Sequence, residues 1–493
     1  MKYFKFFLIF VGLIVYSFSC TKKLDVENLN QPDLVQIMQS PDDVKGVASS
    51  LLNGWFQTVH GYNGPALSMW AMSDNGTCSW GTAGMKDLSS EPRMNFVNTS
   101  SSVYRYIIEN YWKSLYSINS SANDVLWAIE LNEMEIGEGG SETNMIKAVS
   151  YMCQGLAVGY LALVFDKVYL VDETTKDILA IDEASTYQEA TAFAVKKLEK
   201  AIAIFEAEDF VLPDGWIPGD EYTSSDMASL AHSFVVRLLV YKARNASQNS
   251  AVDWSLVLDH AKKGIQKDFA PLSDDETWYS LYHTYAVYPG WGRVDMRVIN
   301  MMDPTIPLVW PDGGYMSHSN LLEMNSTDKR AVTDFQYLAS NNFRPERGLY
   351  HFSSYRYSRL DQYITTWKEP MRDLTVAENE LFIAEAYCQL GNLAAAADVI
   401  NAGTRVTRGE LPVIGASVSE VKDAIWYERN VELILSGMGI QFFDMRRHNQ
   451  LQSGTLLHFP IPAEQLEIMG ESLYTFGGNS GIPGEDVSIG GWK

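Results

Sequence analysis

The segment that is most informative about the fold is residues 376–405, VAENELFIAEAYCQLGNLAAAADVINAGTR. Its first half places apolar residues three and four positions apart, which predicts one face of an α-helix. Gly391-Asn392 then predicts a stop, because both residue types tolerate the left-handed backbone that ends a helix. A second apolar stripe begins at Leu393, so the stretch predicts two helices joined by a tight turn.

Small residues in this hairpin predict that its two helices pack closely. Ala384 lies on the first helix and Ala396 on the second, and together with Tyr387 and Gly391 they have the spacing of a tetratricopeptide unit. One such hairpin cannot bury its apolar face alone, so the sequence predicts neighbours of the same kind.

Apolar stripes with helical spacing recur along the chain and predict three further pairs. The predicted partners are 41–59 with 102–135, 143–165 with 187–206, and 226–245 with 253–267. Four pairs exceed the roughly three repeats that such arrays need for stability. The predicted fold is therefore mostly α, with about four tetratricopeptide-like helical pairs forming a scaffold.

Two long irregular inserts interrupt this scaffold within one predicted α domain, residues 41–493. Helical pairs are expected within 41–268 and 376–435, an irregular insert over 269–375, and a C-terminal segment over 436–493. In the insert 18 of 107 residues are aromatic, against 12% in the whole chain. A second irregular stretch, 61–100, separates the helices of the first pair. Loops of this length are usually functional or disordered, and the Trp and Met content of 61–100 argues against disorder.

Residues 1–40 predict export and lipid attachment. Lys2 and Lys5 precede an apolar segment, Phe6 to Phe18, that is too short to span a membrane. Cys20 follows directly, in the place of the acylated cysteine of bacterial lipoproteins. We expect residues 1–19 to be a signal peptide, Cys20 the lipid anchor and 20–40 an extended tether. Plain secretion with ordinary cleavage is the alternative.

Composition and motifs argue against several function classes. The chain has 61 acidic and 38 basic residues and a formal charge of −23, which disfavours nucleic acid as a partner. No nucleophile elbow, phosphate-binding loop or zinc-protease motif occurs, and the eight histidines are scattered singly. The sequence therefore predicts no catalytic residue, no cofactor and no metal site.

One charged cluster near the end of the chain could suggest catalysis. Its members are Glu428, Glu432, Asp444, Arg446 and Arg447. Arginines and carboxylates at a helix–loop junction commonly fix one helix to another. We interpret the cluster as structural for that reason.

The inserts also hold the candidate binding residues. Sugar recognition needs a flat aromatic ring for the C–H face and fixed amides or carboxylates for the hydroxyls. MWAMSDNGTCSWG in the first insert, and YAVYPGWGR and LVWPDGGY in the second, combine these groups. The predicted ligand-binding residues are Trp70, Asp74, Asn75, Trp80, Trp291 and Trp310. The alternative for each tryptophan is a plug that anchors an irregular loop onto the helices.

Four features in this order resemble the SusD/RagB family of Bacteroidota outer-membrane lipoproteins. They are the lipoprotein-like start, the AEAYCQLGN…AADVIN hairpin, the ERNVEL helix that leads to FFDMRR, and Phe459-Pro460-Ile461-Pro462. The chain departs from the family's pattern at SGMGIQ, residues 436–441, which is longer than the usual turn before the aromatic pair. The resemblance covers nearly the whole chain.

The resemblance implies a non-enzymatic surface lipoprotein of the outer membrane that faces the exterior. Such a protein would bind a nutrient, commonly a glycan, on loops opposite the repeat face. It would then deliver that nutrient to a SusC-like TonB-dependent transporter without chemical turnover. Two alternatives stay open from the residues: an all-α glycosidase whose carboxylates converge only in space, and an adaptor that binds only proteins through its repeats.

Overall fold

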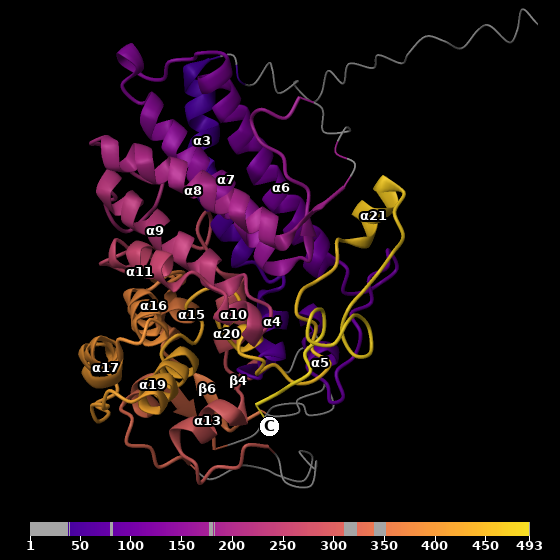
Figure 1. The fold of residues 1–493 in the computed structure, drawn as a ribbon, viewed down its shortest axis with the longest axis vertical. Helices are drawn as coiled ribbons and strands as arrows, with labels where there is room; N and C mark the ends of the chain where they lie inside the picture. The colour runs from indigo at the N-terminus through magenta and orange to yellow at the C-terminus, as the bar shows by residue number, and fades with distance from the viewer. Residues whose placement is uncertain are drawn as a thin grey trace, which may run out of the picture.

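The computed structural model describes residues 38, 40–78, 82–176, 181, 183–309, 323–339 and 352–492, and this part of the chain is mostly α-helical. Paired helices run down one side of the molecule, from α3 (Pro41–Val59) and α6 (Tyr106–Leu126) to α16 (Val376–Gln389) and α17 (Leu393–Ala402). The yellow C-terminal segment runs along the other side (Figure 1). The predicted fold class is confirmed.

The first pair begins where its capping residues place it. The Ser40 side chain accepts a hydrogen bond from Asp43 N, and Pro41 occupies the first turn of α3, where its missing N–H has no partner to lose. α6 begins at Tyr106, four residues later than predicted, because residues 102–105 form turns. A π-helical turn, Trp127–Leu131, extends α6 close to the predicted end.

The other pairs stack on the first in chain order. The second pair is α7 (Thr143–Val164) with α8 (Tyr187–Ala207), and the third is α9 (Ser224–Tyr241) with α11 (Trp254–Lys262). α7 packs on α6 and α8, α8 on α9, α9 on α11, and α11 on α16. Gly391 turns the chain between α16 and α17 at φ 80°, in the left-handed region, as the Gly-Asn pair predicts.

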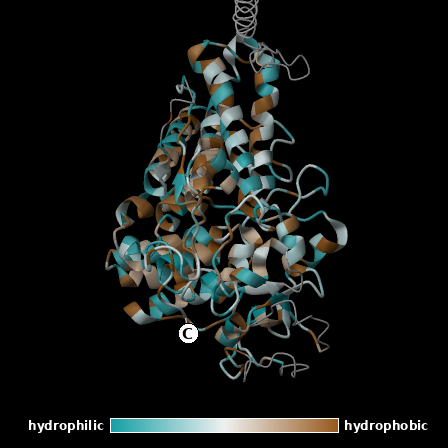
Figure 2. Cartoon of the chain, turned by 90° about the vertical axis from the view of Figure 1, so that its right-hand side faces the viewer, coloured by the Kyte–Doolittle hydropathy of each residue, from teal (hydrophilic) through white to brown (hydrophobic). Residues whose placement is uncertain are grey.

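Helix α7 is the central helix of this stack. By length and composition alone it could cross a membrane, but 94% of its 18-residue apolar stretch is buried among the other helices. A Cβ added at Gly155 would lie 2.8 Å from Leu198 Cγ, and one at Gly159 would lie 2.6 Å from a methyl carbon of Leu238. These glycines therefore let α8 and α9 approach α7 closely. Figure 2 shows that hydrophobic and hydrophilic residues alternate along the helices.

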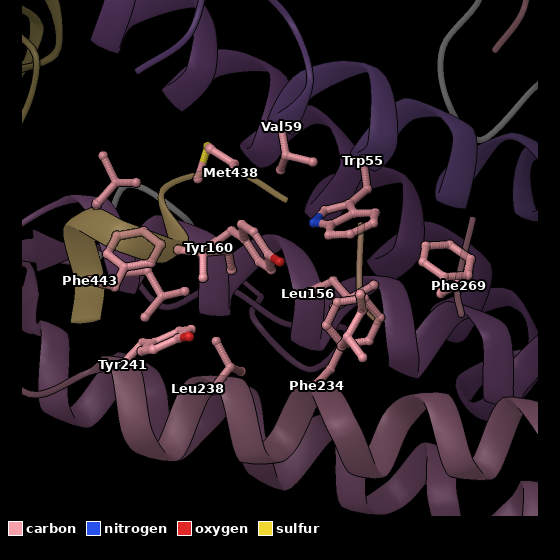
Figure 3. Packing of buried hydrophobic residues seen from close by; sticks show 14 of the residues in the cluster. Trp55, Val59, Leu156, Tyr160, Phe234, Leu238, Tyr241, Phe269, Met438 and Phe443 are labelled. Atoms are coloured by element: carbon pink, nitrogen blue, oxygen red, sulfur yellow. The ribbon is translucent and has the colours of Figure 1, made fainter. Parts of the chain in front are cut away.

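The core is centred on Trp55 of α3, whose side chain is fully buried. Its ring lies edge-on to Tyr160 of α7 at 5.1 Å and to Phe234 of α9 at 5.3 Å between centroids. Phe269, which follows α11, closes the cluster at 6.5 Å (Figure 3). One indole thus joins the first three helical pairs, and such edge-to-face pairs add about 0.5–1.5 kcal/mol each beyond area burial.

The charged cluster at the end of the chain forms a buried, charge-balanced network between helices. Arg429 of α19 (Val418–Val431) lies 2.6 Å from Asp444 of α20 (Ile440–Arg447), and Arg447 lies 2.6 Å from Glu385 of α16. Arg429 also lies 2.7 Å from Glu385, so two guanidiniums face two carboxylates. The cluster fixes α19 and α20 to the repeat stack, as its structural interpretation predicts.

Arg446 has a separate role at the C-terminus of α7. Its guanidinium donates to Leu163 O at 3.0 Å and to Leu457 O at 2.7 Å. Arg244 donates to Leu163 O and Ala162 O at 2.7 and 2.6 Å. Two buried cations thus satisfy the last carbonyls of α7 and complement the negative end of its dipole.

The irregular inserts contain more regular structure than the sequence predicts. β1 (Gly76–Cys78) pairs antiparallel with β4 (Gly292–Val294), with Gly76 opposite Val294, and β5 (Phe335–Tyr337) pairs antiparallel with β6 (Tyr355–Tyr357). β2 (Lys167–Val168) pairs with β3 (Ser185–Thr186) in the α7–α8 connection. The short helices are α4 (Ala66–Met72), α5 (Met85–Leu88), α10 (Ala246–Ser250), α12 (Leu281–Val287), α13 (Met296–Met302), α14 (Arg330–Thr333), α15 (Asp361–Thr366), α18 (Thr404–Thr407) and α21 (Ala463–Met469), with 3₁₀ turns at Thr82–Gly84 and Glu138–Gly140. Runs this short give too few residues for periodicity to separate helix from strand.

Candidate functional site

Trp70, the first of the predicted binding residues, lies in the interior. All seven residues of α4 are buried, and Trp70 is 3% exposed. Its indole covers Gly76, where any added Cβ would overlap the ring. The expectation of an accessible stacking surface at Trp70 is therefore corrected: an apolar seven-residue helix has no polar face to turn toward water.

Asp74 and Asn75 are also turned away from solvent. Both carboxylate oxygens of Asp74 accept from Arg93 Nη2, at 2.9 and 3.0 Å, and Oδ2 also accepts from Trp492 Nε1 at 2.8 Å. Asn75 is fully buried beside β4, where its carbonyl accepts from Asp295 N at 3.1 Å. The Asp74 carboxylate and the Asn75 backbone carbonyl hold the first insert against β4 and the C-terminal segment. The side-chain amide of Asn75 is buried and has no hydrogen-bond partner within the described residues.

Three other predictions fall outside the described residues: Trp80, Trp310 and the lipid anchor Cys20. Trp291 is the member of the predicted set that is described and partly exposed. It lies at the start of β4, directly after Tyr288-Pro289-Gly290. Trp291 N donates to Tyr288 O at 2.9 Å, and Gly290 has φ 86°, so the four residues form a tight turn. Proline followed by glycine in the two central positions favours a type II turn.

This turn completes a row of four partly exposed rings, which we call the aromatic platform: Tyr62, Tyr285, Tyr288 and Trp291. Tyr62 and Tyr285 are stacked, with centroids 5.3 Å apart and planes 12° apart. Trp291 lies 5.1 Å from Tyr285 and 4.7 Å from Tyr288. Tyr288 is 39% exposed. The rings come from the α3–α4 connection, α12 and the turn before β4.

A groove of about 420 Å³ begins at the platform, because Tyr62 belongs to both. Amide side chains of Gln57, Asn63 and Asn110 line it, together with the Tyr279 ring. Lys113 at its edge is paired with Glu464 at 2.5 Å. The platform and groove therefore combine aromatic rings with uncharged hydrogen-bonding groups, the chemistry that a neutral sugar needs.

The sequence prediction named Trp291 but missed Tyr62 and Tyr285. Tyr285 carried a usable signal, since Tyr285, Tyr288 and Trp291 are spaced three apart around the Pro-Gly turn. Tyr62 carried none, because it lies 223 positions from Tyr285 and only the fold stacks the two rings.

No catalytic or metal centre was expected, and two observations bear on that expectation. In the described ranges, no group of three or more His, Cys, Asp or Glu side chains fits a metal ion. The buried carboxylates of the end cluster are held by arginines. Glu428 lies 2.6 Å from Arg330, and Glu432 lies 2.9 Å from Arg359 and 2.5 Å from Arg408. These arginines hold the pKa of Glu432 below its ordinary value against the opposing effect of burial.

Comparison with known proteins gives the fold a name. No protein-family model matches the sequence, and no curated protein sequence matches it. Solved structures do match. A SusD superfamily protein from Bacteroides vulgatus has a TM-score of 0.59 at 14% identity and covers 87% of this chain and 97% of its own. A SusD superfamily protein from Parabacteroides distasonis gives the same TM-score and identity, with 86% and 98% covered.

A third match is surface glycan-binding protein A from Bacteroides uniformis, with a TM-score of 0.59, 12% identity, and 88% and 99% of the two chains covered. The matches span nearly the full length of each solved chain, so the likeness extends beyond the helical repeats to the inserts and the C-terminal segment. The chain therefore shares its fold with the solved SusD superfamily proteins, as the resemblance of its hairpin, its charged helix and its Phe-Pro-Ile-Pro segment predicted.

Proposed function

We propose that this protein is a surface lipoprotein that binds an oligosaccharide on the aromatic platform and delivers it to a TonB-dependent outer-membrane transporter. The observation that carries the proposal is the row of four partly exposed rings beside a groove lined by amides. Stacked rings at this spacing offer a surface for more than one sugar unit. A solved protein of the same fold is named a surface glycan-binding protein, which supports the same reading.

The binding is proposed to involve no chemical turnover. No charged side chain belongs to the platform, and the charged group at the groove edge, Lys113, is already paired. General acid–base catalysis needs a titratable group within hydrogen-bond reach of the bond that breaks. The platform supplies stacking and hydrogen bonds, which hold a sugar without activating it.

The anchor and the partner complete the proposal. Cys20 would carry the lipid and hold the protein at the outer membrane, facing outward. The helical repeats would pack on a SusC-like transporter. Replacing Cys20 by alanine should move the protein from the membrane fraction to the soluble fraction, and affinity capture of the intact lipoprotein from solubilised membranes should recover a TonB-dependent transporter.

The central experiment measures glycan binding by calorimetry with a panel of neutral oligosaccharides. Trp291→Ala should weaken binding by about tenfold or more, because one stacked ring is worth about 1.4 kcal/mol or more. Tyr288→Ala should act in the same direction. Trp127→Ala, an exposed tryptophan in the π-helical turn after α6, is the matched control and should leave neutral-glycan binding unchanged. Unchanged binding in Trp291→Ala and Tyr288→Ala, or release of reducing ends by the wild type, would contradict the proposal.

A further inference from the structure

A second hollow, which we call the arginine cleft, lies beyond the other end of β4. Its volume is about 570 Å³, within the range of small-ligand pockets. Its walls come from α10, α13, α16, α19 and α20 and from the last turn of the chain. No residue that lines this cleft belongs to the aromatic platform or to its groove.

Arg297 of α13 lies in the wall of this cleft between two indoles. Its Cζ is 5.7 Å from the Trp426 ring and 5.8 Å from the Trp492 ring. Trp426 and Trp492 are partly exposed, whereas Arg297 is 2% exposed. The geometry places a cation at the back of the cleft with an aromatic face on each side.

Hydrogen bonds fix the guanidinium of Arg297, and Asp295, Asp74 and Asp444 act on its charge without a direct ion pair in the described residues. Nε donates to Asp74 O at 3.0 Å, and Nη2 donates to Asn430 Oδ1 at 2.8 Å. The partner of Nη1 is the Met301 sulfur at 3.7 Å, which is a weak acceptor. Within the described residues, Arg297 forms no ion pair. A buried charge without a counter-ion is costly, so Nη1 is a donor that an anionic ligand could satisfy.

The carboxylates near Arg297 are each engaged elsewhere. Asp74 is paired with Arg93. Asp295 accepts from the backbone N of Arg297 at 2.9 Å, and burial together with Asp74 raises its pKa well above its ordinary value although Arg297 and Arg93 oppose this. Glu385 and Asp444 face Arg429 and Arg447 in the balanced network.

The charged side chains of the lining balance one another, with Arg297, Arg429 and Lys422 against Glu385, Asp423 and Asp444, and His448 in addition. Lys422 and Asp423 are exposed at the rim and offset each other. Asp444 and Glu385 raise the pKa of His448 above its ordinary value although burial opposes them. Arg429, another wall residue, is 1% exposed and has an Nε without a hydrogen-bond partner in the described part. Among these lining residues, Arg297 is therefore the cation whose Nη1 an anion could contact.

We propose that the arginine cleft binds an acidic sugar, with its carboxylate at Arg297 and its ring against Trp426 and Trp492. Amides of Asn249, Gln389 and Gln450 line the same cleft and match sugar hydroxyls better than an apolar acid. This site is separate from the aromatic platform and does not depend on it. The protein would then recognise a glycan with neutral and acidic units at two places.

The test uses glucuronate and glucose as probes in calorimetry with the wild-type protein. Glucuronate should bind at least about tenfold tighter than glucose. This difference in affinity should shrink as the salt concentration rises from about 0.02 to about 0.5 M, because salt screens only the carboxylate contact. Acetate and inorganic sulfate test whether a bare anion suffices. Equal affinity for the two sugars would overturn the proposal, and so would acetate or sulfate binding as tightly as glucuronate.

Variants locate the binding. Arg297→Gln should abolish the preference for glucuronate, and Trp426→Ala should weaken glucuronate about tenfold. Lys422→Gln should weaken glucuronate binding less than Trp426→Ala does. Lys196→Gln, on the exposed face of α8, is the matched control for Lys422→Gln. If Arg297→Gln does not fold, the effects of Trp426→Ala and Lys422→Gln on glucuronate affinity still show whether glucuronate binds in the arginine cleft. Trp291→Ala should not change glucuronate binding. Loss in Trp291→Ala without loss in Trp426→Ala would overturn the site, and failure here leaves neutral-glycan binding on the platform untouched.

Discussion

Trp70 and Trp291 come from sequence stretches of the same character, yet the structure gives them opposite environments. Both lie in long inserts between the predicted helices, and each is followed by a glycine within six positions. Trp70 lies on a helix with no polar face and covers Gly76, whereas Trp291 follows a Pro-Gly turn that leaves its ring beside Tyr288 at the surface. A tryptophan in an insert is thus not by itself a sign of a binding site, because the local backbone determines whether its ring faces the core or the surface.

The largest effect on stability is expected at Trp70. Trp70→Ala should lower the free energy of unfolding by about 3–5 kcal/mol, because it removes a buried indole and leaves a cavity under β1. Urea denaturation followed by circular dichroism measures it. A loss below about 1 kcal/mol would show that Trp70 is not a core residue and would reopen its role as a binding residue.

Gly76 tests the contact from the other side. Gly76→Ala forces a methyl group against the Trp70 ring and should cost about 1–3 kcal/mol, the usual cost of overpacking. Gly46→Ala on α3 is the control, since nothing lies within 4 Å of a Cβ there. That control should be neutral or stabilising by up to about 1 kcal/mol. Equal effects at the two glycines would contradict the packing described for Trp70.

Trp291 should behave in the opposite way to Trp70. Trp291→Ala is expected to lower the free energy of unfolding by only about 1 kcal/mol, because the ring is partly exposed and packs on one side against Tyr285 and Tyr288. The same denaturation series measures it. A loss as large as that of Trp70→Ala would mean that Trp291 serves mainly as an anchor of the insert.

The smallest effect is expected at the edge of the groove. Lys113→Ala removes an ion pair with Glu464 in which both side chains are exposed, and such pairs contribute about 0–1 kcal/mol. We expect no measurable change in thermal stability and no loss of neutral-glycan affinity. A clear loss of affinity would place a charged contact in the groove and weaken the case for a neutral ligand.

The helical scaffold was predictable because its signal is repeated. The stripe Val44, Ala48, Leu51, Trp55 and Val59 is buried along α3 as its spacing predicts, and the ends of α16 and α17 match their capping residues. Helix ends shifted where turns compete, as at α6. The short helix α4 was missed because seven residues, six of them apolar, do not reveal a period.

The candidate sites were less predictable, and the reason is distance along the chain. The stacking of Tyr62 on Tyr285 and the placement of Arg297 between Trp426 and Trp492 join residues that no local pattern relates. Trp426 carried a weak signal, since it lies off the buried stripe of α19 formed by Val421, Ala424 and Ile425. A bulky ring on the polar side of a helix is a feature that can be searched for directly.

The last carbonyls of α7 are bound by residues that come much later in the chain. Val164 O accepts from Phe459 N at 2.8 Å, and Leu163 O accepts from Arg446, 283 residues later in the chain. A ribosome makes the chain from its N-terminus, so the first helical pairs exist long before these partners do. The carbonyls at the end of α7 therefore lack these partners until the C-terminal part of the chain is made. Long-range contacts of this kind slow folding and prolong the exposure of apolar surface.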